Sequence, residues 1–325
     1  MDDRSTCFSV LPRLLDEKRG RSLANCGVLV VVVLTLGGCI GPTPAKPDQP
    51  YQNSLGMKFL PLPRSAVLVS IWETRVQDFK AFVMATGYDA KQRVYSLTSS
   101  GWEPLGANWE NPGFTQTPKN PVCGISREDA TAFCEWLTAK ERKAGLLTSA
   151  QAYRLPTDSE WSLAAGLIED PDQTPAEKDA HVSAFSSVRP IPPNQEDNLG
   201  SFRYPWGNQW PPPPGAGNYA GTEAEDGDWP VRWNTIEGYR DRFPRTAPVG
   251  SFAPNRLGLY DLSGNVAEWC EDNYEPGNPS GILRGGSYLT NVQSFLLTAD
   301  RAEGPPTSRF TDRGFRCVIA TKSTQ

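Results

Sequence analysis

The sequence predicts a loop-rich α+β domain with few short helices and strands. The chain has 325 residues, among them 29 Gly, 30 Pro and 10 Trp, and aromatic residues make up 10% of it. So much Gly and Pro limits regular structure, while the aromatic side chains argue against disorder outside the ends. Helical apolar patterns alternate with apolar runs of strand length. No repeat with a period of 20–50 residues is present, which argues against a solenoid or a propeller.

Residues 1–38 have the features of a bacterial lipoprotein signal peptide. The run 27–36 is apolar, follows basic residues and is too short to span a bilayer. It ends in Leu-Gly-Gly-Cys, which resembles a lipobox and implies cleavage before Cys39 and lipidation of that residue. Because Ile40 follows instead of Asp, we expect a location in the cell envelope, in the outer membrane facing the periplasm. The alternatives are an ordinary secretory signal or a simple membrane anchor.

The predicted domain spans residues 53–322 and follows a Pro-rich tether, 39–52. Its first predicted strand covers 57–62. A helix is then expected to begin at Thr74, because Gln77 three residues later completes a capping box.

Two further helices are predicted from the same signal. Ser126 is followed by Asp129 in the reciprocal position, and Thr157 is followed by Glu160. Residues 168–200 lack periodicity and are rich in Pro, Asp and Ser, which predicts an insertion at the surface.

Six motifs then occur in a characteristic order. They are RLPTDSEW from position 154, YPWGN from 204, TAPVGSF from 246, GLYDLSGNVAEW from 258, LRGGSY from 283 and RGFRC from 313. Together they resemble the formylglycine-generating enzyme, or sulfatase-modifying factor, family over roughly residues 53–319. The resemblance implies the fold of that family, which is related to C-type-lectin-like domains.

Glu268 stands among the apolar residues Val266, Trp269 and Cys270, so it needs a partner, since burying a carboxylate alone is costly. The resemblance implies a structural calcium ion, which favours hard oxygen ligands from a loop. By position its ligands would be Asp261, the carbonyls of Gly264 and Val266, and Glu268. The alternative is an Asx-turn at Asp261 and a hydrogen-bonded Glu268 without a metal.

A second calcium ion is implied before the TAPV motif. By position its ligands would be Asn218, the carbonyl of Tyr219, Asp241 and the carbonyl of Phe243. Four acidic residues of the divergent loop between these positions could alter this site, namely Glu223, Glu225, Asp226 and Glu237.

Four cysteines remain after the predicted cleavage and lipidation, and an even number in an exported protein favours disulfides. The resemblance implies a bridge between Cys134 and Cys317, which leaves Cys123 and Cys270 as a second pair by elimination only. The alternative for both pairs is free buried thiols.

Copper chemistry is not expected. Active members of the family carry two cysteines, two and seven residues beyond the Tyr of RGGSY, and these bind Cu(I), which selects thiolates. Here the equivalent positions are Thr290 and Phe295. Ser287 keeps a family active-site position and is the candidate catalytic residue, although a Gly-Gly-Ser turn also explains it.

Several other classes are disfavoured by composition. The single histidine, His181, cannot build a three-His iron site, and a net charge of −5 without a basic cluster gives no footprint for nucleic acid. The sequence contains no G-x-S-x-G, P-loop or dinucleotide motif. The expected partners are the membrane, through the lipid on Cys39, and an exported protein or a small-molecule ligand.

Two functions compete. The first is a calcium-stabilised binding or accessory domain without copper-dependent activity. The alternative is a divergent oxidoreductase of the family that modifies an exported protein or a small molecule, and a plain sulfatase activator is disfavoured by Thr290 and Phe295. An enzyme should keep a concave site around Ser287 and Arg284. In a binding domain, Phe295 and Leu296 would fill that groove.

Overall fold

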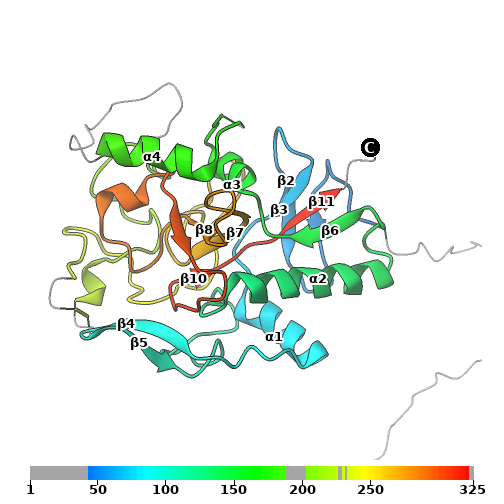
Figure 1. Cartoon of the computed structure of the whole chain (residues 1–325), viewed down its shortest axis with the longest axis horizontal. Coiled ribbons are helices and arrows are strands. Elements are labelled where there is room, and N and C mark those ends of the chain that lie inside the picture. The colour runs from blue at the N-terminus through cyan, green and yellow to red at the C-terminus, as the bar shows by residue number, and fades with distance from the viewer. Residues whose placement is uncertain (1–42, 171, 187–202, 226–228, 231–232, 322–325) are drawn as a thin grey trace, which may run out of the picture. The chain divides into compact units, whose positions relative to one another are not determined.

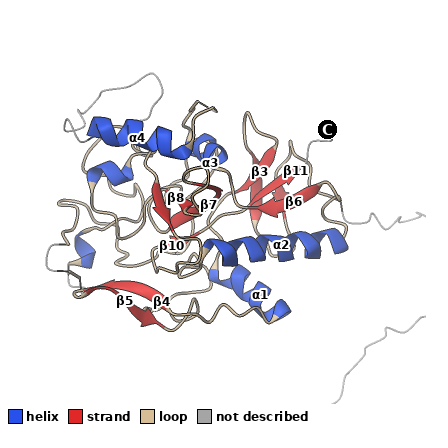
Figure 2. Cartoon of the chain, viewed as in Figure 1, coloured by secondary structure: helices blue, strands red, loops and turns tan. Residues whose placement is uncertain are grey.

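A computed structural model describes residues 43–170, 172–186, 203–225, 229–230 and 233–321. The predicted signal peptide and the predicted lipidation site Cys39 lie outside these residues, as does Asp226. The α+β prediction is confirmed, because short helices and small sheets are joined by long loops (Figure 1 and Figure 2). Within the described residues, no helix is both long and apolar enough to cross a membrane.

The largest sheet has five antiparallel strands and brings both ends of the domain together. The last strand, β11, pairs with β3 on one side, where Val318 lies opposite Val69, and with β6 on the other, where it lies opposite Arg154. The strand order is β1 (Tyr51–Gln52), β2 (Lys58–Pro61), β3 (Val67–Ser70), β11 (Val318–Thr321) and β6 (Gln151–Arg154).

The start of this sheet corrects the predicted tether. Strand β1 lies inside the segment 39–52, and the Ala45 N–H donates to the Leu146 carbonyl at 3.1 Å. The Gln151 side-chain amide donates to the Ala45 carbonyl at 2.7 Å. Buried hydrogen bonds of this kind hold backbone that would otherwise be solvated. The domain boundary at residue 53 is therefore too late.

A second sheet carries the motif strand and was not foreseen in this loop-dominated part of the chain. Its order is β10 (Arg313–Gly314), β7 (Ala267–Asn273), β8 (Gly281–Arg284) and β9 (Ala302–Gly304). Strand β10 is parallel to β7 and places Gly314 opposite Glu268. A separate hairpin joins β4 (Val94–Thr98) to β5 (Gly101–Gly106).

The predicted capping boxes of two helices are confirmed. The Ser126 hydroxyl accepts from the Asp129 N–H before α2 (Arg127–Lys143), and the Thr157 hydroxyl accepts from the Glu160 N–H before α3 (Asp158–Ala165). Helix α2 lies along one face of the five-stranded sheet (Figure 1). The main core lies between them and contains Phe59, Phe79, Phe133, Leu137, Tyr153 and Phe315.

Helix α1 (Val76–Thr86) begins one residue later than predicted. Arg75 is the N-cap residue, and the Asp78 carboxylate accepts from the Arg75 N–H at 3.1 Å and from its guanidinium. The Thr74 N–H donates instead to the Phe315 carbonyl at 2.8 Å. The capping box predicted at Thr74 is wrong, because a backbone hydrogen bond to Phe315 in the C-terminal segment holds Thr74 outside the helix.

The surface insertion predicted over 168–200 contains a helix, α4 (Pro175–Ser186), on which His181 falls. The helix is docked, because the Tyr274 hydroxyl donates to the Asp179 carboxylate at 2.7 Å. It lies beside α3 (Figure 2). The segment therefore takes part in the domain despite its lack of sequence periodicity.

The four cysteines of the described domain are buried free thiols in the structure. The Sγ atoms of Cys134 and Cys317 lie 3.6 Å apart in the main core. The other predicted pair is not brought together: the Cys123 thiol donates to Gln116, whereas Cys270 packs in a second core cluster. The predicted bridge between Cys123 and Cys270 is therefore wrong for this structure, because a buried thiol does not need a disulfide partner.

We predict that oxidised protein carries a bridge between Cys134 and Cys317 and none between Cys123 and Cys270. Two thiols at 3.6 Å need only a small movement to reach bonding distance, and the other two have separate surroundings. Peptide mapping under non-reducing conditions measures the linkage. A peptide pair that joins Cys123 to Cys270 would contradict the described arrangement.

Candidate functional site

The centre of the GLYDLSGNVAEW loop is a buried ion pair between Glu268 and Arg316. The Arg316 Nε and Nη2 atoms each lie 2.6 Å from a carboxylate oxygen, and both side chains are fully buried. The Trp161 indole N–H also donates to Glu268 Oε2 at 3.0 Å. Arg316, from the RGFRC motif, therefore provides the partner that the buried Glu268 carboxylate requires.

Arg316 also binds backbone from two other parts of the chain. Its Nη2 donates to the carbonyls of Tyr260 at 2.9 Å and Asp261 at 3.1 Å, and its Nη1 donates to the Ser70 carbonyl at 3.2 Å. One guanidinium thus connects β3, the motif loop and β7. A charged donor with several acceptors forms strong, oriented hydrogen bonds.

A third acid, Glu73, is buried next to this pair. Its carboxylate accepts from the Asn265 side-chain amide at 2.7 Å and from the Val266 N–H at 3.1 Å. Burial raises the pKa of Glu73 well above its usual value, the charges of Asp261 and Glu268 raise it further, and Arg316 opposes them. The sequence indicated no role for Glu73, because an acid before a helix is usually solvated.

The residues predicted for the first calcium site fit a calcium ion poorly, because their carboxylates already accept hydrogen bonds. Both oxygens of Glu268 are engaged by Arg316, and the Asp261 carboxylate accepts from the Gly250 N–H at 2.6 Å. Burial raises the pKa of Asp261 to about 6, and the Gly250 N–H and the Arg316 guanidinium oppose this rise. The carbonyls of Gly264 and Val266 belong to the same loop. Calcium at this loop stays a prediction.

The second predicted site fits a hard cation better. Asn218 Oδ1 and Glu223 Oε1 are buried oxygens without a hydrogen-bond partner among the described residues. The Asp241 carboxylate accepts from the N–H groups of Tyr219 and Phe243, each at 2.8 Å. Buried acceptors without donors are unusual and indicate a missing partner.

The charges at the second predicted calcium site also favour a bound cation. Burial raises the pKa of Asp241 to about 8, the N–H groups of Phe243 and Tyr219 lower it, and the neighbouring Glu223 raises it again. The Asp241 N–H donates to Glu223 Oε2 at 3.2 Å, so the two acids share one site. The structure thus brings Glu223 to the predicted ligands, whereas Glu225 and Glu237 are not among their described contacts.

Ser287 lies in a closed turn instead of an open cleft. Its N–H donates to Thr290 Oγ1 at 2.9 Å, its hydroxyl accepts from the Leu289 N–H at 3.2 Å, and its carbonyl accepts from the Thr290 N–H at 2.9 Å. Ser287 is buried. These contacts account for a serine at this position by its role in the turn.

The neighbouring apolar residues differ from the expectation for a filled groove. Phe295 is 54% exposed, whereas Leu296 is buried. The expectation that Phe295 fills a groove is therefore wrong, because the 3₁₀-helix η2 (Gln293–Leu296) turns its side chain outward.

Arg284 belongs to a structural charge network. It binds Asp158 together with the Ser162 hydroxyl at 3.1 Å, and its Nη2 donates to the Thr298 carbonyl at 3.0 Å. Arg301 holds the other side of Asp158 at 2.9 and 3.0 Å. Burial alone would raise the pKa of Asp158, but the guanidinium groups of Arg284 and Arg301 outweigh it and hold that pKa well below its usual range.

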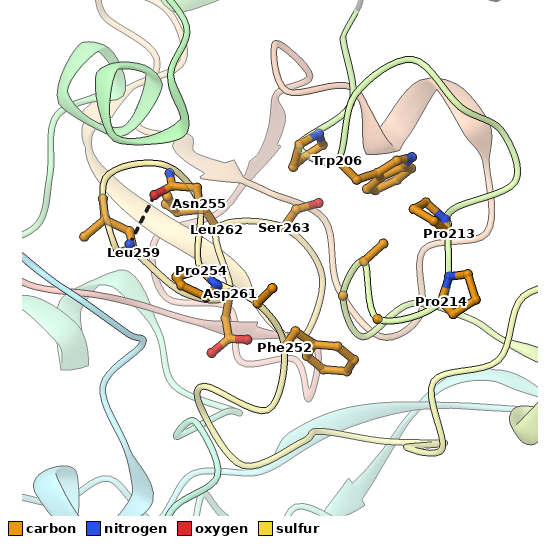
Figure 3. A pocket seen from close by; sticks show the side chains of 15 residues that line it. Trp206, Pro213, Pro214, Phe252, Pro254, Asn255, Leu259, Asp261, Leu262 and Ser263 are labelled. Carbon is orange, nitrogen blue, oxygen red and sulfur yellow. Dashed lines mark hydrogen bonds between the residues drawn. The ribbon is translucent and has the colours of Figure 1, made fainter.

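A pocket of about 260 Å³ is lined in part by the motif loop, through Asp261, Leu262 and Ser263. Figure 3 shows the Ser263 hydroxyl on the side that faces Trp206, and the Asp261 carboxylate between Pro254 and Phe252. Its walls include four prolines and the rings of Trp206 and Phe252. Neither Ser287 nor Arg284 lines it, so it is not the concave site expected for an enzyme.

The fold and these motif positions define a domain of the formylglycine-generating-enzyme type. The sulfatase-modifying factor enzyme 1-like domain model matches residues 66–321, and the chain belongs to this family. The formylglycine-generating enzyme of Thermomonospora curvata is 29% identical over 300 residues, which cover 78% of this chain and 82% of that protein.

Relatives named as inactive are nearly as identical to this chain as those named formylglycine-generating enzyme. The mouse protein named inactive C-alpha-formylglycine-generating enzyme 2 is 28% identical over 229 residues, 67% of this chain and 56% of its own length. Among solved structures, PvdO from Pseudomonas aeruginosa aligns with a TM-score of 0.48 and 18% identity, over 85% of this chain and 99% of PvdO. Overall identity therefore does not decide whether this chain is an enzyme.

We predict that Glu268→Gln lowers the free energy of unfolding by about 3–5 kcal/mol, because it removes the bidentate counter-ion of a buried guanidinium. Urea denaturation measures the loss. The control is the double variant Glu268→Leu with Arg316→Met, which removes both charges and should cost less than Glu268→Gln. A double variant that is much less stable than the single one would contradict this explanation.

Asp158 should make the domain acid-sensitive. Its pKa is lower in the folded state than in the unfolded state, where it is about 3.9. Its contribution is therefore present above that value and is lost as the pH falls through the folded pKa. We expect the stability difference between wild type and Asp158→Asn to shrink as the pH falls below about 4. A difference that stays constant between pH 7 and pH 3 would refute the assignment.

Proposed function

We propose that this chain is an exported, lipid-anchored member of the family that lacks copper-dependent formylglycine-generating activity and acts as a calcium-stabilised binding or accessory domain. The observation that carries the proposal is the state of the two positions expected to hold copper. Thr290 uses its hydroxyl to cap the Ser287 turn, and Phe295 points its ring outward. Neither side chain offers a soft ligand.

No described cysteine replaces the missing pair. Cys123 is one of the described cysteines, and its thiol donates to the Gln116 side-chain oxygen at 3.7 Å. It is buried, and burial raises its pKa, so it is held as the thiol. Cu(I) selects thiolates, and a single neutral thiol cannot supply the expected pair.

The orphaned oxygens of Asn218 and Glu223 support calcium in a structural role. Together with Asp241 and the carbonyls of Tyr219 and Phe243 they would hold the ion. Bound calcium would supply positive charge for two neighbouring buried acids and would tie the loop before the TAPV motif to the domain. No step of a reaction needs to be assigned to it.

The proposed location follows from the N-terminal pattern. Cleavage before Cys39 and lipidation of that residue would place the domain at the cell envelope, in the outer membrane facing the periplasm, where calcium and oxidising conditions are available. Its partner would be an exported protein or a small molecule. Nucleic acid is disfavoured by the acidic net charge of −5.

The absence of copper chemistry is tested by metal analysis of the purified full chain, together with oxygen consumption in the presence of a cysteine peptide of the sulfatase motif. We expect calcium without stoichiometric copper, and no peptide-dependent uptake of oxygen. Peptide-dependent uptake with bound copper or iron would refute the proposal and favour the divergent oxidoreductase.

We further predict that calcium raises the thermal midpoint of the chain over its value in excess chelator. A ligand at about 100 times its Kd stabilises by roughly 2.7 kcal/mol, which corresponds to several degrees. Asp241→Asn should abolish this shift. The matched control is Glu225→Gln, whose exposed carboxylate accepts from the Thr235 hydroxyl at 3.0 Å. A shift that Asp241→Asn leaves intact would place the ion elsewhere and contradict this site.

A further inference from the structure

A second pocket, of about 440 Å³, lies where residues 92–95 meet residues 305–313. Three arginines contribute to it, Arg93, Arg309 and Arg313, together with the rings of Tyr95 and Phe310. No carboxylate is among the described residues that line it. In a chain with a net charge of −5, this concentration of cations is a local exception.

Arg309 shapes this pocket but has little charge to offer. Its Nε and Nη2 atoms donate to the two carboxylate oxygens of Asp129, each at 2.8 Å. Its Nη1 donates to Gln92 Oε1 at 2.7 Å and to the Thr307 carbonyl at 3.1 Å. Such a bidentate pair neutralises the guanidinium and fixes the wall that it forms.

Arg313, in contrast, is poorly compensated. Its side chain is 16% exposed, and among the described residues its guanidinium donates one hydrogen bond, from Nη1 to the Ser308 hydroxyl at 2.9 Å. The Asp312 carboxylate is 3.8 Å from Nε, beyond hydrogen-bonding distance. Burial lowers the pKa of Arg313, and Asp312 only partly opposes this. A guanidinium has five donors, so most of them remain available.

The surroundings hold this guanidinium in one place. It lies 4.2 Å from the centre of the Phe310 ring and 5.6 Å from that of Trp269. A Cβ atom on Gly304 would come within 2.6 Å of its Nη1 atom, so the absence of a side chain there makes room for the head group. A prepositioned cation loses little conformational entropy when it binds an anion.

Exposed rings continue from the pocket onto the β4–β5 hairpin. Tyr95 is 41% exposed and lies 5.5 Å from Phe310, and Trp102 is 42% exposed and lies 4.8 Å from the same ring. Exposed aromatic residues next to a cleft provide flat contact area for a ligand ring. The adjacent Arg93 is exposed and could pair with a charged substituent.

We propose that this pocket binds a small organic carboxylate whose charged group is carried on a ring. The carboxylate lies on Arg313 and Arg93, and the ring packs against Tyr95 and Phe310. The ligand can be a hydroxylated sugar acid or an aromatic acid, since both carry a carboxylate on a ring whose C–H or π face can pack against an aromatic side chain. The inference goes beyond the proposed function and is independent of it, because no residue of the Ser287 turn or of the calcium ligands lines this pocket.

The test is calorimetric titration of the purified full chain with glucuronate and with benzoate. Glucose and benzamide are the neutral counterparts, and inorganic sulfate is an anion without a ring. We expect saturable binding of at least one ring carboxylate, and the tighter of the two identifies the kind of ring. Binding of neither acid, equal binding of the neutral counterparts, or equal binding of sulfate would overturn the proposal.

Variants assign the binding to these residues. Arg313→Gln should weaken it by roughly tenfold or more, because charge-assisted hydrogen bonds are lost. Arg93→Gln tests an exposed residue that the fold does not need, and Gly304→Ala displaces the Arg313 head group without removing its charge; both should weaken binding. The matched control is Arg256→Gln, an exposed arginine that lines a different pocket. Binding unchanged in Arg93→Gln and Gly304→Ala, or weakened equally by Arg256→Gln, would refute the assignment.

Discussion

The ion pair between Arg316 and Glu268 is the interaction on which the architecture depends. Arg316 lies two residues before β11 of the large sheet, and Glu268 lies on β7 in the second sheet. The same guanidinium also donates to the Ser70 carbonyl at the end of β3 and to the Asp261 carbonyl in the motif loop, which is in no regular element. A loop-rich domain has few ladder hydrogen bonds between its parts. A buried charged donor that reaches several carbonyls replaces them.

The buried and half-buried acids of the domain are compensated in different ways. Asp158 has two guanidinium partners, and they keep its pKa low although burial opposes them. Glu73 has amide donors and two neighbouring acids, so its pKa is raised. Asp241 and Glu223 have each other and no described cation, and that is why this pair, rather than the Glu268 loop, fits a metal.

The sequence predicted what depends on local chemistry. The capping boxes at Ser126 and Thr157 use residues three apart, so they are visible in the chain itself. It also showed that Glu268 needs a partner, but that partner lies 48 residues further on, at a distance that no local pattern specifies. The local pattern also places Thr74 at the start of a helix, because it does not show that the Thr74 N–H pairs with the distant Phe315 carbonyl.

Thr290 and Phe295, which occupy the positions where the family resemblance implies copper thiols, are compatible with this scaffold. The hydroxyl of Thr290 accepts the Ser287 N–H and closes the turn, so the RGGSY segment is held without a metal. The residues that stabilise the domain, among them Arg316, Glu268 and Arg284, take no part in that chemistry in the structure. Fold and reaction are therefore separable here. A chain can keep the family's motifs because they build its core, and a relative named as inactive has nearly the same identity to this chain as one named formylglycine-generating enzyme.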